Sequence, residues 1–322
     1  SSEVGVLEVP EEKIVLKERL HPGKMLLVNT VQGKVLNDEE VKEYYAKKQP
    51  YGEWLDSYLV QLKDIKIPNL PVEEYTKEER MRLQKAFGYT YEEYRSSIGK
   101  MALNGVEATA SMGIDTPLAV LSHEHQPLFN YFKQLFAQVT NPPIDCIREE
   151  IVTSTSVYVG RDGNLLEEEP KNCQVLKINN PILTNTDMLK IKNMKVEGFK
   201  AVTVPITYYK SAPLDRAMDR LFVEVDRAHR AGANILILSD RGVDENHVAI
   251  PSLLAVSAVH QHLVKTKKRT SLAIILESGE PREVHHFATL LGYGACAINP
   301  YLALDTIHEL IEEEMLDKDY YA

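Results

Sequence analysis

Asn234-Ile-Leu-Ile-Leu-Ser-Asp-Arg-Gly242 is the stretch of the chain that decides its fold. Four aliphatic residues follow one another without alternation, which is typical of a strand buried on both faces. The polar residues Ser239 to Gly242 then mark the point where the strand ends. A strand of this kind belongs inside a sheet that is covered on both sides.

The same pattern repeats on both sides of this strand. The sequence predicts further strands over residues 201–204, 272–276 and 295–298. It predicts helices over residues 214–231, 250–264, 283–291 and 305–316, with Gly232 ending the first of them. Apolar strands joined by helices imply parallel pairing with right-handed crossovers. The fold class is therefore α/β, and both an open sheet and a barrel fit the pattern.

Polar residues follow three of these strands: Asp240, Arg241, Glu277, Ser278 and Asn299. Because parallel strands end at one edge, these side chains are expected to meet at one rim. One interpretation is a rim that faces a ligand or a tunnel. The other is a set of ion pairs and caps that brace the loops. No Ser-His-Asp or Cys-His arrangement can be argued from the spacing.

The remaining motifs favour structural roles. Residues 292–297 match G-x-G-x-x-A, but they follow a predicted helix and lead into a strand, the reverse of a dinucleotide loop. His285 and His286 are adjacent, whereas two zinc ligands on a helix need a spacing of four. One of the pair is expected to face the sheet. Two further histidine pairs have no metal spacing either, namely His123 with His125 and His260 with His262.

Composition sets the outer limits. The 322 residues include 47 acidic and 37 basic side chains, for a net charge of −10, so a nucleic-acid surface is not expected. The one dense basic run, residues 265–269, is interpreted as a solvated helix end. No apolar run is long enough for a membrane span, and no secretory signal opens the chain. The length suits one large domain or two smaller ones.

The three cysteines, Cys146, Cys173 and Cys296, form no C-x-x-C pattern. An iron–sulfur cluster, a structural zinc site and a disulfide framework are therefore not expected. A reducing cytoplasm fits this usage. The start, Ser1-Ser-Glu-Val-Gly, lacks an initiator methionine and reads like a cut inside a longer protein.

Residues 1–64 form a first unit. A hairpin over residues 24–36 turns at Gln32-Gly33, and Asn37 or Asp38 caps a helix that Pro50-Tyr-Gly52 ends. The unit has too few apolar residues for a core of its own, so it is expected to pack against something else. Residues 65–75 read as a linker.

Two capped helices follow the linker, because Thr76 with Glu79 and Thr90 with Glu93 have the capping-box spacing. Residues 157–180 read as turn-rich and polar.

Residues 131–153 are the other organising stretch. Apolar spacing from Phe132 to Val139 predicts a short helix with one buried face, which Asn141-Pro-Pro stops. Ile144, Ile147 and Ile151 then resume a helical spacing. The stretch is interpreted as a rigid corner between two packed segments.

Several long runs, in the right order, resemble glutamate synthases. Residues 131–153 resemble the central domain of that family, with Cys146 where the family has proline. Met112-Gly-Ile-Asp also departs, at Ile114, from a family pattern similar to Met-Gly-Asn-Asp. Further matching runs are residues 234–242, 249–258, 277–279, 283–287, 291–294 and 299–302. Residues 20–28, 38–40 and 49–55 resemble the tail of the glutamine amidotransferase domain of the same family.

The resemblance implies a fold and a division of the chain. It favours a degenerate (β/α) barrel-like central domain related to FMN-linked barrels, with a small N-terminal β-hairpin and helix segment. Residues 1–64 would be the amidotransferase tail, 65–75 a linker and 76–322 the central domain.

The family makes two glutamates from glutamine, 2-oxoglutarate and a reductant. It uses an amidotransferase domain that releases ammonia, a domain with FMN and an iron–sulfur cluster, and electrons from NADPH, NADH or ferredoxin. The nucleophile and the FMN and cluster sites belong to regions that this chain does not match. The resemblance therefore transfers no catalytic, cofactor-binding or metal-binding residue.

The expected role is that of a non-catalytic scaffold that supports ammonia transfer. Its expected partners are the amidotransferase and FMN domains of the same parent chain, with a small reductase subunit or ferredoxin outside it. The alternative is a stand-alone barrel that binds a small anionic metabolite at the strand-end rim.

Overall fold

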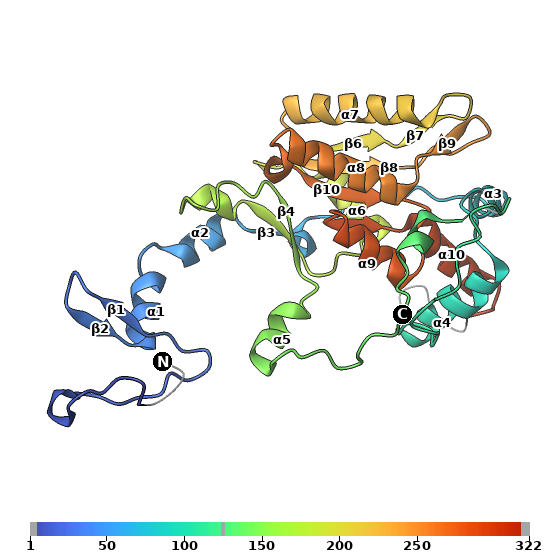
Figure 1. Cartoon of the computed structure of the whole chain (residues 1–322). Coiled ribbons are helices and arrows are strands. Elements are labelled where there is room, and N and C mark those ends of the chain that lie inside the picture. Colours follow the sequence, from blue (N-terminus) through green and yellow to red (C-terminus); the bar gives the residue numbers. More distant parts are fainter. Residues whose placement is uncertain (1–4, 124–125, 317–322) are drawn as a thin grey trace.

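The computed structural model describes residues 5–123 and 126–316, and Figure 1 shows the chain. The N-terminal unit begins with a 3₁₀ turn, η1 (Glu11–Lys13), and the antiparallel hairpin of β1 (Leu27–Asn29) and β2 (Lys34–Leu36). Helix α1 (Asp38–Ala46) starts with a capping box of Asn37 and Glu40. The predicted hairpin and helix are thus confirmed.

The role predicted for residues 50–52 is wrong. Helix α1 already ends at Ala46, and Pro50 instead precedes a second helix, α2 (Tyr51–Tyr58). A proline is tolerated at the start of a helix because its missing amide hydrogen has no partner to lose there.

The main sheet has the strand order β11-β10-β8-β6, and every pair in it is parallel. Its strands are β6 (Ala201–Pro205), β8 (Ile235–Ser239), β10 (Ala273–Glu277) and β11 (Ala297–Asn299). Strands that follow one another in the sequence are therefore neighbours in space. The α/β class and the parallel pairing are confirmed.

The connecting helices α7 (Leu214–Arg230), α8 (Ser252–Lys265) and α9 (Val284–Gly292) cover one face of the main sheet. Leu236 and Leu276 pack into the same core cluster as these helices. Their neighbours Ile235 and Ile275 point the other way, into a cluster with helix α6 (Asn185–Asn193). This alternation follows from the two-residue period of a strand. Within the described residues the sheet is open, which is one of the two predicted alternatives.

A second, smaller sheet of order β3-β5-β4 covers the α6 side. It contains β3 (Val60–Gln61), β4 (Val157–Gly160) and β5 (Val175–Ile178), with the 3₁₀ turns η2 (Leu62–Asp64) and η5 (Pro170–Cys173) beside it. The prediction of turn-rich structure for residues 157–180 is therefore wrong at its two ends. These strands are short and gain their order from pairing, which local sequence does not reveal.

A helical cap, defined here as residues 76–104, lies across the carboxyl ends of the main sheet. It contains α3 (Lys77–Ala86), the π-helical turn η3 (Glu93–Ile98) and α4 (Gly99–Asn104), and it packs on α10 (Tyr301–Glu312). Thr76 and Glu79 form the predicted capping box. The other predicted pair also exchanges hydrogen bonds, because the Glu93 carboxylate accepts from the Thr90 amide at 2.8 Å.

Three short elements lie beside the main sheet and its loops. Strand β7 (Thr207–Tyr209) pairs antiparallel with β9 (His247–Ala249), and η6 (Arg269–Ser271) precedes β10. Across the parts of the chain that are described, no helix combines the length and the apolar character needed to span a membrane.

The helix predicted from Phe132 to Val139 is wrong. A 3₁₀ helix, η4 (Leu128–Phe132), comes first, and an irregular stretch then leads to α5 (Cys146–Val152), which Asp145 caps. Phe136 and Val139 are 75% and 71% exposed, so no buried face exists. A short amphipathic helix is marginal unless its apolar side packs on something, and the described residues provide no such surface for this stretch.

Candidate functional site

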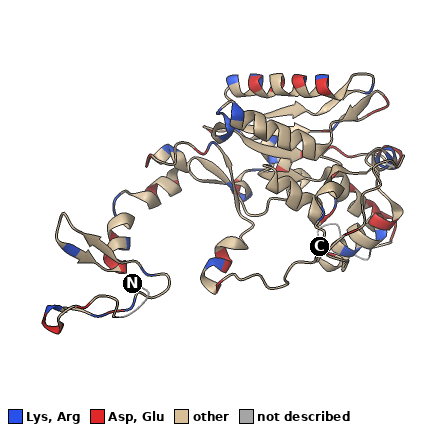
Figure 2. Cartoon of the chain, in the orientation of Figure 1, with Lys and Arg blue, Asp and Glu red and all other residues tan. Residues whose placement is uncertain are grey.

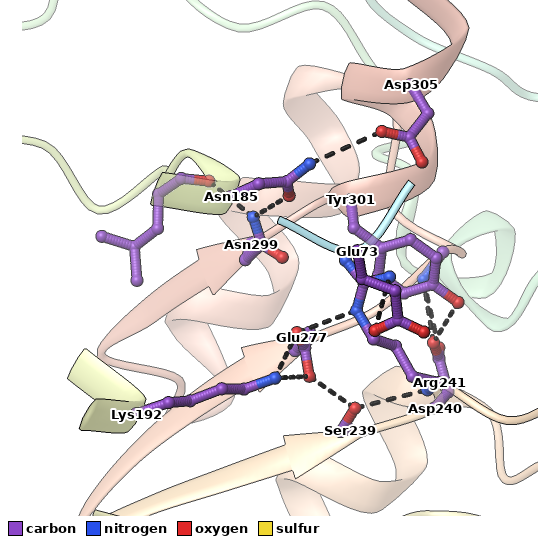
Figure 3. Close-up of polar contacts among 12 residues, drawn as sticks. Glu73, Asn185, Lys192, Ser239, Asp240, Arg241, Glu277, Asn299, Tyr301 and Asp305 are labelled. Atoms are coloured by element: carbon purple, nitrogen blue, oxygen red, sulfur yellow. Dashed lines mark hydrogen bonds and ion pairs between the residues drawn. The ribbon is translucent and has the colours of Figure 1, made fainter. Parts of the chain in front are cut away.

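The structure brings the predicted strand-end residues to one edge of the main sheet (Figure 3). The parallel register places Glu277 directly between Ser239 on β8 and Asn299 on β11. Asp240 and Arg241 follow β8, and all of these side chains except that of Arg241 are buried. Their convergence follows from the fact that parallel strands end at one edge.

Glu277 is the centre of this rim. Its carboxylate accepts hydrogen bonds from Arg241 Nε at 2.9 Å, Lys192 Nζ at 2.7 and 2.9 Å, and Ser239 Oγ at 2.6 Å. Burial opposes its ionisation, but the bonds from Lys192 and Ser239 and the charge of Arg241 hold the pKa of Glu277 below its usual range. Glu277 is therefore a charged acceptor between two cations.

Arg241 is held on every side. Its guanidinium lies 4.1 Å from the ring centre of Tyr301 and 5.5 Å from that of Tyr75. It donates to the Tyr75 hydroxyl at 2.8 Å and forms an ion pair with Glu73 at 3.4 Å. Burial raises the pKa of Tyr75 to about 12. All of these partners come from the chain itself, so Arg241 presents no open cationic site.

Asp240 is the acidic member of the rim that, among the described residues, has no cationic hydrogen-bond partner: all three of its donors are neutral groups. Its carboxyl accepts hydrogen bonds from the Ser278 hydroxyl, from the Gly279 amide at 3.0 Å and from the Tyr301 hydroxyl at 2.9 Å. Burial raises the pKa of Asp240 to about 7, although these three donors favour the ionised form. Desolvation is thus the larger effect here.

Asn299 joins the rim to helix α6. Its amide donates to the Leu183 carbonyl at 2.9 Å and to Asn185 Oδ1 at 3.0 Å. Asn185 in turn contacts Asp305, and burial raises the pKa of Asp305 to about 6. Asn299 Oδ1 and Asp305 Oδ2 are buried oxygens without a protein partner among the described residues.

The helical cap closes the rim from above. Arg282, with its side chain 1% exposed, pairs with Glu93 of the cap at 3.0 Å. It also donates to the carbonyls of Phe87 at 3.3 Å and Gly88 at 3.0 Å. The Tyr89 hydroxyl donates to the Gly279 carbonyl at 2.9 Å. In an open (β/α) protein this space would hold a ligand.

Close packing confirms that the space is filled. A methyl group added at Gly279 would lie 2.7 Å from the Phe87 ring and 3.1 Å from the Tyr301 hydroxyl. Only glycine therefore allows the cap to sit this near the strand ends. The rim side chains are thus joined to one another and to neighbouring elements by hydrogen bonds and ion pairs of the chain itself.

A cavity of about 430 Å³ lies beside the rim, between α3 and the loop after β8. Four carboxylates and one guanidinium line it, together with Tyr75, Leu83 and Val243. The charged lining residues are Glu73, Glu79, Asp244, Glu245 and Arg82. This excess of negative charge does not suit an anionic metabolite, so the geometry does not support the stand-alone binding alternative.

The two adjacent histidines both contact Phe129. His286 is buried and stacks on Phe129 with ring centres 4.3 Å apart, and burial lowers the pKa of His286 to about 3. His285 is half-buried, with Nε2 3.0 Å from the Phe129 carbonyl oxygen. The pair therefore anchors a neighbouring segment.

His260 and His262 have separate partners. His260 Nδ1 contacts Arg269 at 3.0 Å, and His262 Nε2 lies 3.1 Å from Asp226. His123 is exposed, whereas His125 falls outside the described residues.

The glycine motif ends a helix, as predicted. Gly292 is the last residue of α9, Gly294 has φ +115°, and β11 begins three residues later. The three cysteines are free thiols. Across residues 5–123 and 126–316, no group of three His, Cys, Asp or Glu side chains is placed to hold a metal ion.

Sequence reasoning missed four residues beside the rim: Lys192, Tyr75, Tyr301 and Arg282. Lys192 lies on α6, a helix that was not predicted, and Tyr75 lies in the predicted linker. Tyr301 directly follows Asn299-Pro300, so its place after a strand end was the one available signal. Arg282 carried no signal, since its partners lie about 190 positions away.

These features define the class of protein. It is an α/β domain with a parallel sheet, and its own helical cap covers the carboxyl edge of that sheet, where such domains usually bind their ligands. The chain belongs to the glutamate synthase family: residues 82–322 match the family model described as glutamate synthase central domain. Residues 1–54 match a second family model, glutamine amidotransferases class-II. The resemblance seen in the sequence is confirmed.

Three relatives show the breadth of the match. The chain is 46% identical to the glutamate synthase [NADPH] large chain of Bacillus subtilis, over 99% of this chain and 21% of the relative. It is 39% identical to the glutamate synthase [NADH] of Schizosaccharomyces pombe, over 98% of this chain and 16% of the relative. It is 41% identical to the chloroplastic ferredoxin-dependent glutamate synthase of Oryza sativa subsp. japonica, over 96% of this chain and 19% of the relative. The chain thus spans about a fifth of these relatives or less.

Proposed function

We propose that this chain is a non-catalytic scaffold inside a glutamate synthase, which makes two glutamates from glutamine, 2-oxoglutarate and a reductant. It holds the amidotransferase domain and the FMN domain in register, so that ammonia passes between them without reaching solvent. The parent enzyme is an oxidoreductase, and its relatives are named for NADPH, NADH or ferredoxin.

One observation carries this proposal: the strand-end edge, where such folds perform their chemistry, is closed. The guanidinium groups of Arg241 and Arg282 both donate to carboxylates of this chain, and Phe87 packs on Gly279. A rigid, filled edge suits a part that positions its neighbours. The rim residues Asp240, Arg241, Glu277, Ser278 and Asn299 then serve as braces and not as ligand contacts.

The division of the chain is part of the same proposal. Residues 1–64 are the amidotransferase tail, 65–75 the linker and 76–322 the central domain. The expected partners are the two catalytic domains of the parent polypeptide, with a small reductase subunit or ferredoxin as the outside electron donor. The free cysteines support a reducing compartment such as the cytoplasm.

We also propose that the domain is a degenerate relative of FMN-linked (β/α) barrels. Its strand order runs in sequence order from β6 to β11, and its crossover helices lie on one face, as in part of a barrel wall. A parallel bridge between Ile182 and Ile298 extends the same wall by one position. Helix α6 and the smaller sheet fill the side that a barrel would enclose.

Two assays on the purified chain test the scaffold role. After incubation with FMN (~20 μM protein, a typical working concentration for micromolar binding) and removal of unbound flavin by gel filtration, we expect no absorbance near 450 nm in the protein fraction. We also expect no ammonia release from glutamine. Flavin bound at one equivalent, or glutaminase turnover by the isolated chain, would refute the proposal.

A further inference from the structure

An apolar arm connects α4 to β4, and it consists of residues 105–123 and 126–156. Among the described residues, the arm packs into the core of the protein at η4, where Phe129 is fully buried and stacks on His286. Phe132 also meets the edge of Tyr293, with ring centres 5.1 Å apart. The arm therefore leaves the core and returns to it at defined places.

The backbone of the arm is fixed by contacts within the arm. The Ile114 amide donates to the Gln134 carbonyl at 3.0 Å, and Gln134 Nε2 donates to the Met112 carbonyl at 3.3 Å. Gly113 lies so close to the opposite segment that an added methyl group would be 2.9 Å from the carbonyl carbon of Phe136. Such close pairing specifies one conformation.

The side chains around this pairing are nevertheless exposed. Six large apolar residues, which we call the arm patch, are each between 40% and 75% exposed: Met112, Ile114, Phe132, Leu135, Phe136 and Val139. Together they leave on the order of 600 Å² of apolar surface open, the upper limit for a patch on a monomer. A surface of this size marks a contact.

The arm also lacks the charges of a solvated linker. Between residues 108 and 144 only Asp115, Glu124 and Lys133 carry a charge, whereas 26% of the whole chain is charged. Figure 2 shows the stretch between α4 and α5 almost entirely tan. Disordered segments have the opposite composition, with low hydrophobicity and high charge. The partner of the arm patch is therefore apolar and uncharged where it docks.

The last described residues of the chain lie near the start of the arm. Leu316, the last described residue, is buried against Leu310 and Ile98, next to α4 where the arm begins. The relatives are about five times longer than this chain. Polypeptide that continues past this point in a relative would emerge beside the root of the arm.

We propose that the arm patch is the docking surface for the domain that follows residue 322 in the full-length glutamate synthase. The proposal rests on the scaffold role. Of the two catalytic domains that the scaffold would contact, it assigns the second to the arm patch. The N-terminal unit lies at the other end of the arm, where Ile147 of α5 approaches Gly23. The arm thus reaches from the tail of one catalytic domain toward the start of the next.

Hydroxyl-radical footprinting of the full-length enzyme and of the 322-residue chain tests the assignment. We expect the oxidation of Met112 and Phe136 to be at least tenfold slower in the full-length enzyme. Tyr209 of β7, which is 58% exposed and remote from the arm, should react equally in both and is the matched control. Equal oxidation of the arm patch in both proteins would overturn the proposal.

Two further outcomes keep the test decisive. If the arm patch is already protected in the isolated chain, and the protection disappears on dilution, the occupant is a second copy and the proposal is wrong. In the full-length enzyme, Phe136→Asp should raise Met112 oxidation toward the value of the isolated chain, whereas Val223→Asp on α7 should not. A result that overturns the docking proposal would not overturn the scaffold role, because the flavin and glutaminase assays test that role separately.

Discussion

Replacing Arg282 by methionine should detach the helical cap from the main sheet. Arg282 joins the two through the Glu93 carboxylate and the carbonyls of Phe87, Gly88 and Glu280, all within 3.3 Å. Methionine fills similar space but leaves the Glu93 carboxylate without its cationic partner and three carbonyl oxygens without the Arg282 donor. Removal of one partner of a buried ion pair costs about 3–5 kcal/mol.

The lower end of that range applies here. The side chain of Glu93 is 22% exposed, so its carboxylate regains part of its hydration when the pair is broken. We therefore expect a loss of about 3 kcal/mol, which is about a 100-fold change in the opening equilibrium. Because the broken contacts to Glu93, Phe87 and Gly88 link the cap to the sheet, this loss should appear first as local opening of residues 77–86.

Hydrogen exchange and urea unfolding measure this effect. Amides of α3 should exchange about 100-fold faster in Arg282→Met, in line with that free energy, and Arg282→Lys should fall between, since lysine cannot serve the carbonyls and the carboxylate together. Adding Glu93→Gln should restore part of the stability, because no unpaired charge remains. The matched control is Arg227→Met, whose exposed pair with Glu224 is worth less than about 1 kcal/mol. If Arg282→Met costs no more than this control, the cap is not held as described.

Three other substitutions test separate parts of the structure. Gly279→Ala should destabilise the protein by about 1–3 kcal/mol in urea unfolding because the methyl group meets Phe87, while Gly292→Ala, which meets nothing within 4 Å, should not; equal effects would contradict the closed rim. In melting curves, the stability of Asp240→Asn relative to the parent chain should increase as pH rises from about 4 to about 7 and stay constant above pH 7. The raised pKa of Asp240 in the folded state makes the parent chain lose stability over that pH range, so a pH-independent difference would refute the raised pKa. Phe129→Ala should cost about 3–5 kcal/mol or release the apolar arm to proteolysis, whereas Phe132→Ala, which is 43% exposed, should do neither.

The main sheet could be predicted because the composition of its strands indicates their burial. The aliphatic runs of β8 and β10 have no polar face, so these strands must be buried on both sides. The convergence of Glu277 and Asn299 followed from parallel register alone. Strands β4 and β5 escaped prediction because they alternate in a polar context and depend on pairing with each other.

The wrong helix from Phe132 to Val139 has a different cause. The apolar spacing predicts a face that is buried, but it does not say whether this chain or another domain buries that face. The cap contacts made by Tyr75 and Arg282 were out of reach for a third reason. Their partners lie far away in the sequence, and no local pattern encodes such distances.

Strand β3 has a consequence for swapping parts between related enzymes. Val60 and Gln61 pair with Leu176 and Lys177, and Leu62 is buried in the core that includes the smaller sheet. A chimaera joined at residue 64 would thus insert an edge strand from one parent into the sheet of another. A junction upstream of Leu59 would instead keep strand and sheet from the same ancestor, and it is the natural place to exchange amidotransferases.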